Sequence, residues 1–92
     1  MKANDIPVLP RGVRRHFDTI RNVPVLLGPE RVLMLDQIGC AVLDEVDGVS
    51  SINQISSRLA EKYNAPLTEI SADVTGYLVD LADKRLVDMN DG

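Results

Sequence analysis

The segment from residue 26 to residue 44, LLGPERVLMLDQIGCAVLD, changes its hydrophobic pattern at a single residue, and this change restricts the possible folds of the chain. Up to Leu35 the apolar residues form a dense run that is typical of a strand. From Asp36 onward the spacing is that of one helical face, carried by Ile38, Ala41, Val42 and Glu45. A strand therefore leads into a helix with almost no loop, and we expect the pair to form a slot for a binding partner.

The length and the cysteine content limit what such a slot can do. Ninety-two residues form one small domain with a modest core, so a deep catalytic cavity is not expected. Cys40 is the single cysteine, so the chain can form neither an internal disulfide nor a thiolate metal cluster, as is typical of a reducing compartment. Neither a signal peptide nor an apolar run of about 20 residues is visible. These features predict a soluble, cytoplasmic binding module.

Charge is distributed unevenly along the chain. Residues 1–31 carry six basic residues and three acidic ones, whereas residues 32–92 carry four basic and eleven acidic residues. Such polarity can steer the encounter with a charged partner, although two solvated faces of opposite sign are the simpler interpretation.

Proline, glycine and periodicity divide the chain into three parts. Residues 1–12 contain Pro7, Pro10 and Gly12 without periodicity, which predicts a flexible N-terminal arm, or a linker from a preceding domain. Residues 13–88 form the predicted domain, and residues 89–92 a polar tail.

The first half of the domain predicts three strands. Val13 to Asp18 alternate as a first strand, Asn22 turns the chain, and residues 25–27 continue a second strand. A turn at Gly28-Pro29 leads to a third strand from Arg31 to Leu35, with Val32 and Met34 on one face and Leu33 and Leu35 on the other. If the second strand is central, Pro24 has to lie at its start or in a bulge, because proline cannot donate to the ladder.

The second half predicts three helices. Asp36 caps the first, which runs to about Val46, ends at Asp47-Gly48, and turns Ile38, Ala41, Val42 and Val46 inward. Ser51 caps the second, which buries Ile52, Ile55 and Leu59, with Tyr63 as a further candidate, and ends at residues 64–66. Thr68 caps the third, which buries Ile70, Val74, Tyr77, Leu78 and Leu81. Leu86 and Val87 then close the core.

This element order predicts an α+β fold, namely a small winged helix-turn-helix-like domain with a three-stranded antiparallel sheet followed by three helices. A winged helix often binds DNA, but the last helix carries Glu69, Asp73, Asp80 and Asp83, which phosphates would repel. We therefore expect no nucleic acid among the partners, although a nucleic-acid-binding domain remains an alternative.

Side chains that carry out chemistry are sparse. His16 stands between arginines without a second histidine at metal-ligand spacing, and Cys40 is interpreted as a small packed side chain. Asp44, Glu45 and Asp47 suit a solvated helix end and turn. The sequence thus predicts no catalytic residues, no metal site and no enzyme.

Three segments in order, VLLGPERVLMLDQIGCAVLDEVDG, INQISSRLAEKYNAP and ISADVTGYLVDLADKRLV, resemble the PqqD family of pyrroloquinoline quinone (PQQ) biosynthesis. The resemblance covers residues 10–87. Its most specific parts are the Leu-x-Pro-Glu turn before the third strand, the Asp-Gly after the first helix, and the Asp-Val and Tyr-Leu pairs of the last helix. Where many members carry a small-residue pair after the third strand, this chain has Ile38-Gly39-Cys40-Ala41, a departure that bears on the width of the slot.

The resemblance implies a peptide-recognition element without a cofactor. Such a protein binds the leader of the precursor peptide PqqA and presents it to the radical S-adenosylmethionine enzyme PqqE, which cross-links a Glu and a Tyr. The leader is held as an added strand beside the third strand and against the first helix.

Strand addition is physically consistent with this sequence, because an exposed edge strand offers backbone groups to an extended peptide. The predicted peptide-binding residues are Arg31, Val32, Leu33, Met34, Leu35, Ile38, Gly39, Ala41, Val42 and Glu45. Gly39 either allows close approach of the peptide or eases helix packing. A monomer is favoured over a dimer, but a self-associating structural domain that uses the same edge is a further alternative.

Overall fold

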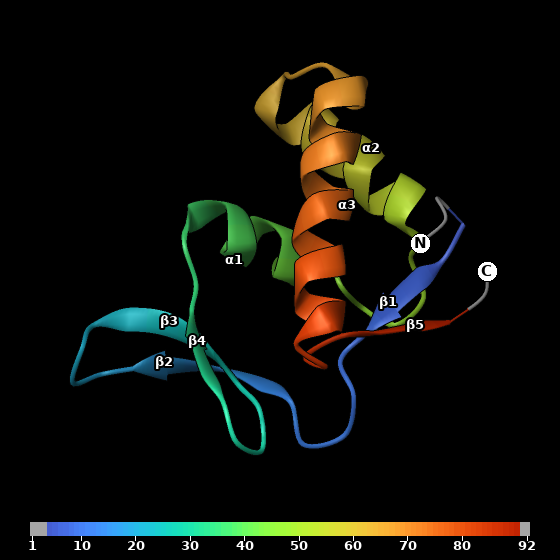
Figure 1. The fold of residues 1–92 in the computed structure, drawn as a ribbon. Coiled ribbons are helices and arrows are strands. Elements are labelled where there is room, and N and C mark those ends of the chain that lie inside the picture. Colours follow the sequence, from blue (N-terminus) through green and yellow to red (C-terminus); the bar gives the residue numbers. More distant parts are fainter. Residues whose placement is uncertain (1–3, 91–92) are drawn as a thin grey trace.

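The computed structural model describes residues 4–90, which form an α+β fold. The elements in chain order are β1 (Ile6–Val8), β2 (Arg14–Asp18), β3 (Val23–Leu27), β4 (Val32–Met34), α1 (Gln37–Asp44), α2 (Ile52–Tyr63), α3 (Leu67–Asp83) and β5 (Asp88–Asn90) (Figure 1). Strands β2, β3 and β4 form an antiparallel meander in that spatial order. The predicted fold class, a three-stranded antiparallel sheet followed by three helices in a winged helix-turn-helix-like domain, is confirmed.

Turn residues set the register of the meander. Asn22 adopts a left-handed conformation with φ of 58° between β2 and β3, as asparagine tolerates, so its predicted place in a turn is confirmed. The Gly28 N–H donates to the Arg31 carbonyl at 2.8 Å and closes the β3–β4 hairpin. Pro24 is the second residue of β3, and pairing with β4 begins at Val25, so its predicted place at the start of a central strand is also confirmed.

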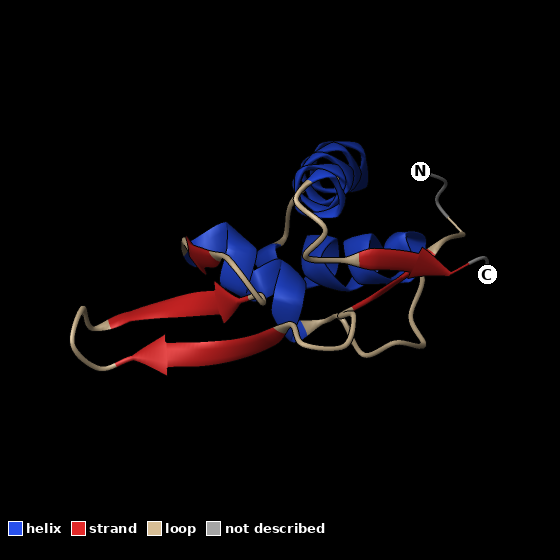
Figure 2. Cartoon of the chain, turned by 60° about the horizontal axis from the view of Figure 1, so that its bottom comes forward, coloured by secondary structure: helices blue, strands red, loops and turns tan. Residues whose placement is uncertain are grey.

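The two faces of the meander differ in burial. Arg15, Leu26 and Leu33 pair across the sheet on the face that turns toward the helices. Leu26 is fully buried, Leu33 packs against the core, and Arg15 forms an ion pair with Asp44 at the end of α1. The predicted alternation in β4 is confirmed, because Leu35 is buried whereas Val32 and Met34 are exposed. The β2–β3 hairpin projects away from the helices (Figure 2).

Helix α1 is shorter than the sequence predicted. The Asp36 carboxylate accepts the Gly39 N–H at 2.7 Å, as expected for an N-cap. The predicted end at Asp47-Gly48 is wrong, because the N–H groups of Glu45 and Val46 turn back to carbonyls three residues earlier and stop the helix at Asp44. Gly48, with φ of 79°, belongs to the following turn.

The inward position predicted for Ile38 is also wrong. Its side chain is 57% exposed, because it lies in the first turn of a short helix at the mouth of a pocket. Leu43, which the pattern did not single out, is buried instead.

Helices α2 and α3 form the main helical layer, and the core lies between them, α1 and the sheet. Ser51 and Gln54 form a capping box at the start of α2, and Asn64 ends it in a left-handed conformation. The predicted cap at Thr68 is wrong, because α3 begins at Leu67 after Pro66 without a side-chain cap. The core residues that the sequence predicted correctly are Ala41, Val42, Ile52, Ile55, Leu59, Val74, Leu78, Leu81, Leu86 and Val87.

The region expected to be a flexible arm contains a strand. β1 pairs antiparallel with β5, and the two lie side by side near the start of α2 (Figure 1). Pro7 is fully buried, and the Asp5 carbonyl accepts the Ile52 N–H at 2.9 Å. No local pattern signals this pairing, because each strand has three residues and its partner lies at the other end of the chain. The division into arm, domain and tail stays a prediction.

None of the helices within residues 4–90 combines the length and the apolar character required to cross a bilayer.

Candidate peptide-binding site

Strand β4 is the edge of the meander, and its hydrogen-bond pattern decides which backbone groups face outward. Gly28 pairs with Arg31 through the bond described above, and the Leu35 N–H donates to the Pro24 carbonyl at 2.9 Å. Because hydrogen-bonded pairs alternate along an antiparallel ladder, Leu33 faces β3 with its backbone groups. The N–H and C=O groups of Val32 and Met34 therefore point to the open edge.

The side chains of the five predicted β4 contacts divide into two groups. Arg31 precedes the strand and is exposed, and Val32 and Met34 are 55% and 62% exposed. Leu33 and Leu35 turn toward the core, and Leu35 is only 7% exposed. A partner at this edge thus meets the outward backbone groups and the exposed side chains of Val32 and Met34, whereas the backbone groups of Leu33 face β3.

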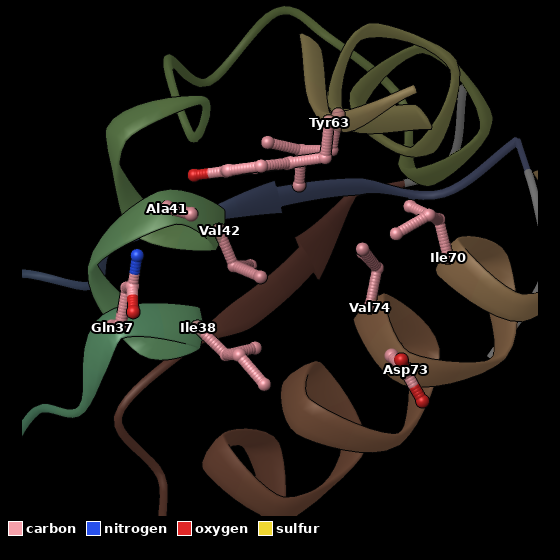
Figure 3. A pocket seen from close by; sticks show the side chains of 9 residues that line it. Gln37, Ile38, Ala41, Val42, Tyr63, Ile70, Asp73 and Val74 are labelled. Atoms are coloured by element: carbon pink, nitrogen blue, oxygen red, sulfur yellow. The ribbon is translucent and has the colours of Figure 1, made fainter. Parts of the chain in front are cut away.

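An apolar pocket of about 260 Å³ opens between α1, α2 and α3 (Figure 3). Most of its wall is aliphatic, and Gln37 and Asp73 add polar groups. Tyr63 extends from the end of α2 across the pocket toward α1 (Figure 3). The lining residues are Gln37, Ile38, Ala41, Val42, Leu59, Tyr63, Ile70, Asp73 and Val74.

The peptide-binding residues predicted in and just after α1 do not all lie at one site. Ile38, Ala41 and Val42 line the pocket, although Val42 is almost fully covered, at 1% exposure. Glu45 lies beyond the end of α1 with its carboxylate 3.7 Å from the Arg58 guanidinium, and it does not line the pocket. Nine of the ten predicted residues thus divide into the β4 edge, the pocket and the end of α1, where the sequence predicted one slot, and the tenth, Gly39, lies outside all three.

Gly39 lies against Tyr77 of α3. A Cβ atom at Gly39 would stand 2.9 Å from Cζ of Tyr77, closer still to its hydroxyl, and 3.2 Å from the Asp36 carboxylate. Of the two interpretations of this glycine, the contact favours helix packing. Burial raises the pKa of Tyr77, and the charges of Asp36, Cys40 and Asp80 raise it further, so the phenol stays protonated at neutral pH.

Six pocket residues were not predicted as site residues, and the sequence carried partial signals for some of them. Leu59, Ile70 and Val74 were predicted as core residues from their helical spacing, and Tyr63 was a further candidate. Asp73 was noted as an acidic residue of the last helix and as part of its Asp-Val pair, but not as a site residue, and Gln37 showed no pattern. Which of these residues meet around one cavity depends on how three helices cross, and that is not encoded in local spacing.

Residues 25–87 match the family model described as coenzyme PQQ synthesis protein D (PqqD). A protein of Rhizobium meliloti named PqqA binding protein is 35% identical over 89 residues, which cover 97% of this chain and 91% of the relative. A protein of the same name from Bradyrhizobium diazoefficiens is 47% identical over 78 residues, which cover 85% of this chain and 76% of the relative.

A larger relative and a solved structure agree with these matches. The bifunctional coenzyme PQQ synthesis protein C/D of Methylorubrum extorquens is 46% identical over 86 residues, which cover 94% of this chain but 23% of that protein. The solution structure of the PqqD part of Methylobacterium extorquens PqqCD, described as a functional and stand-alone RiPP (ribosomally synthesized and post-translationally modified peptide) recognition element, superposes with a TM-score of 0.80. It is 45% identical, and the superposition covers 95% of this chain and 93% of that structure. This chain therefore belongs to the PqqD family.

Proposed function

We propose that this chain binds the leader of the precursor peptide PqqA as an added strand on β4 and presents it to the radical S-adenosylmethionine enzyme PqqE in PQQ biosynthesis. The observation that carries the proposal is the open β4 edge, where Val32 and Met34 turn their backbone groups outward. The names of the relatives as PqqA binding proteins support the identity of the peptide. In this role the chain is a monomeric adaptor in the cytoplasm, without catalytic residues or a cofactor of its own.

The peptide would contact the chain in two ways. Within residues 31–35, Val32 and Met34 would supply the outward backbone groups of the ladder and would also add side-chain contacts. An apolar side chain of the leader would enter the pocket between α1, α2 and α3, where it would meet Ile38, Ala41 and Val42. Gly39 would contribute indirectly, because it lets Tyr77 pack on α1. Glu45 would also contribute indirectly, because its ion pair with Arg58 holds the end of α1.

Charge argues against the nucleic-acid alternative. Glu69, Asp73, Asp80 and Asp83 are exposed on α3, the helix that would enter the major groove of DNA. Their carboxylates would repel phosphates.

The proposal is tested by titrating the isotopically labelled chain with a synthetic PqqA leader and following its amide resonances. We expect the largest shift changes in residues 31–35, followed by residues 38–42. Changes centred on the exposed face of α3 would contradict strand addition. An edge that is already occupied in a dimer of the chain alone would favour self-association.

A pair of variants separates the backbone contact from the side chain. Met34→Pro removes one outward N–H while leaving the β3 ladder intact, because proline is tolerated on the solvent side of an edge strand. Loss of one hydrogen bond, about 0.5–1.5 kcal/mol, predicts about two- to tenfold weaker leader binding by calorimetry. Met34→Ala keeps the N–H and serves as the control. Equal affinity for the Met34→Pro and Met34→Ala variants would show that this N–H is not used.

A further inference from the structure

The pocket between α1, α2 and α3 has an apolar interior that is large enough for one peptide side chain. Its volume is about 260 Å³, and Val42, Leu59 and Val74 are its most buried members. In another protein, an apolar cavity of about 150 Å³ already binds benzene. The pocket therefore has room for a large apolar side chain, aromatic or branched aliphatic, whereas an alanine would leave most of the space empty.

The mouth of the pocket carries one charged side chain. The exposed lining residues are Gln37, Ile38, Tyr63 and Asp73, and only Asp73 among these four is charged at neutral pH. Ile38 lies on the α1 wall and Asp73 on the α3 wall (Figure 3). Within residues 4–90 the Asp73 carboxylate forms no ion pair. It is therefore open to a positively charged group of a bound peptide.

The charges near the mouth give a negative sum. On α3, Glu69 lies about one helical turn before Asp73, and it is exposed and without an ion pair within the described residues. On α1, Asp36 places its carboxylate at the first turn. On α2, the charges of Glu61 and Lys62 cancel. A cation is therefore attracted to the mouth, and an anion is repelled.

We propose that the pocket recognises two features of the leader: a large apolar side chain that fills the cavity, and a positively charged group within about two residues of it that pairs with Asp73. The inference rests on the proposed function, because it states what the bound peptide carries at this site. The positive charge can belong to a lysine or arginine side chain or to the terminal ammonium of the peptide, since each donates to a carboxylate.

The position of the pocket along the chain fits a peptide that is also paired with β4. Gln37, the first residue of α1, lies at the mouth three residues after Met34, the last residue of β4. An added strand that continues past Met34 advances about 3.3 Å per residue and so comes to the first turn of α1. The apolar residue of the leader is therefore expected beside the paired segment, and not within it.

Two variants and one matched control test the chain, with binding of a synthetic PqqA leader measured by calorimetry at about 0.15 M salt. Asp73→Asn removes the charge and keeps the shape, and we expect about two- to fivefold weaker binding. Asp83→Asn makes the same change at an exposed site ten residues further along α3 and should leave the affinity unaltered. Ile38→Ala shortens an exposed side chain at the mouth, so the fold is kept, and we expect about fivefold weaker binding.

Substituted leaders identify the two features in the peptide. One set replaces each lysine or arginine singly by glutamine, and a further leader is acetylated at its N-terminus, so that the two sources of positive charge are separated. One of these peptides should bind about two- to fivefold more weakly to the unmodified chain and equally well to the unmodified chain and Asp73→Asn. A second set replaces each apolar residue by alanine, and one member should show the same non-additivity with Ile38→Ala.

Several outcomes would overturn the recognition at the pocket. Equal losses in Asp73→Asn and Asp83→Asn would mean that α3 attracts the peptide only through its overall charge. Additive effects of chain and peptide substitutions would show that the paired groups do not meet, and coupled peptide residues more than about two positions apart would place them at different sites. If the unmodified chain does not bind the leader, the proposed function fails and this inference with it. A leader bound with full affinity by Asp73→Asn and Ile38→Ala contradicts only the recognition at the pocket.

Discussion

Gly39 and Gly76 are both helical glycines, and the structure predicts opposite effects when each is replaced by alanine. Alanine is favoured over glycine in a helix by about 1 kcal/mol. At Gly76 a Cβ atom meets nothing within 4 Å, so Gly76→Ala should raise the free energy of unfolding by up to about 1 kcal/mol. At Gly39 the new methyl group would run into the Tyr77 ring, and such overpacking costs about 1–3 kcal/mol.

The contacts of the new Cβ with Tyr77 lie below 3.0 Å, so we expect the upper part of this overpacking range, about 2–3 kcal/mol. After subtraction of the gain in helix propensity of about 1 kcal/mol, Gly39→Ala should lower the free energy of unfolding by about 1–2 kcal/mol. Shortening the opposing side chain tests the cause. In a Tyr77→Leu background the clash disappears, so Gly39→Ala should become neutral or stabilising, with a coupling free energy of about 1–3 kcal/mol.

The unmodified chain, Gly39→Ala, Tyr77→Leu and the double variant form a double-mutant cycle. Urea unfolding of these four chains and of Gly76→Ala measures the differences in the free energy of unfolding at the transition midpoint. A Gly39→Ala chain as stable as the unmodified chain, or an additive cycle, would refute the packing of Tyr77 on the first turn of α1. Leader affinity of Gly39→Ala, measured at a temperature where the variant is folded, then reports whether displacing α1 changes the pocket.

Two further predictions concern the segment that leads into α2. Ser51→Ala removes the capping box and should cost about 1 kcal/mol of unfolding free energy in urea, whereas Ser57→Ala at an exposed site of the same helix should change stability little; equal losses would contradict the cap. Hydrogen bonds from Ser50 and Val49 lower the pKa of Asp47 from 3.8 to about 2. The stabilisation this gives is therefore fully present above pH 4 and is lost as the pH falls toward 2. The stability difference between the unmodified chain and Asp47→Asn should shrink over that range in acid-unfolding measurements, and a pH-independent difference would contradict it.

The sequence predicted correctly those features that depend on contacts between residues a few positions apart in the chain. Asp36 and Ser51 cap helices because a short polar side chain reaches an N–H three residues on, and the sequence shows both. Asn22 stands at its turn for the equally local reason that asparagine tolerates a positive φ. The same holds for the alternation in β4, where one face packs against the core.

The features that the sequence did not predict depend on contacts between distant segments. β1 exists because β5 lies beside it, and neither has an alternation long enough to be recognised. Ile38 and Val42 lie four residues apart on one helical face, yet Ile38 is exposed because it lies in the first turn of α1 at the mouth of the pocket. The division of the predicted slot into an edge and a pocket has the same origin.

The abrupt passage from strand to helix at Asp36 has a mechanical consequence for the proposed complex. The Leu35 N–H holds the end of β4 to the Pro24 carbonyl, and the next residue, Asp36, caps α1 through Gly39. The edge that would bind the peptide backbone and the helix that forms one wall of the pocket are thus fixed to each other by consecutive residues. When a peptide binds the edge and the pocket together, little free energy is lost in ordering the protein, because the site is already formed. Lengthening this junction by a glycine between Leu35 and Asp36 should therefore weaken leader binding more than loss of the Met34 N–H does, since it uncouples the two contacts while leaving each intact.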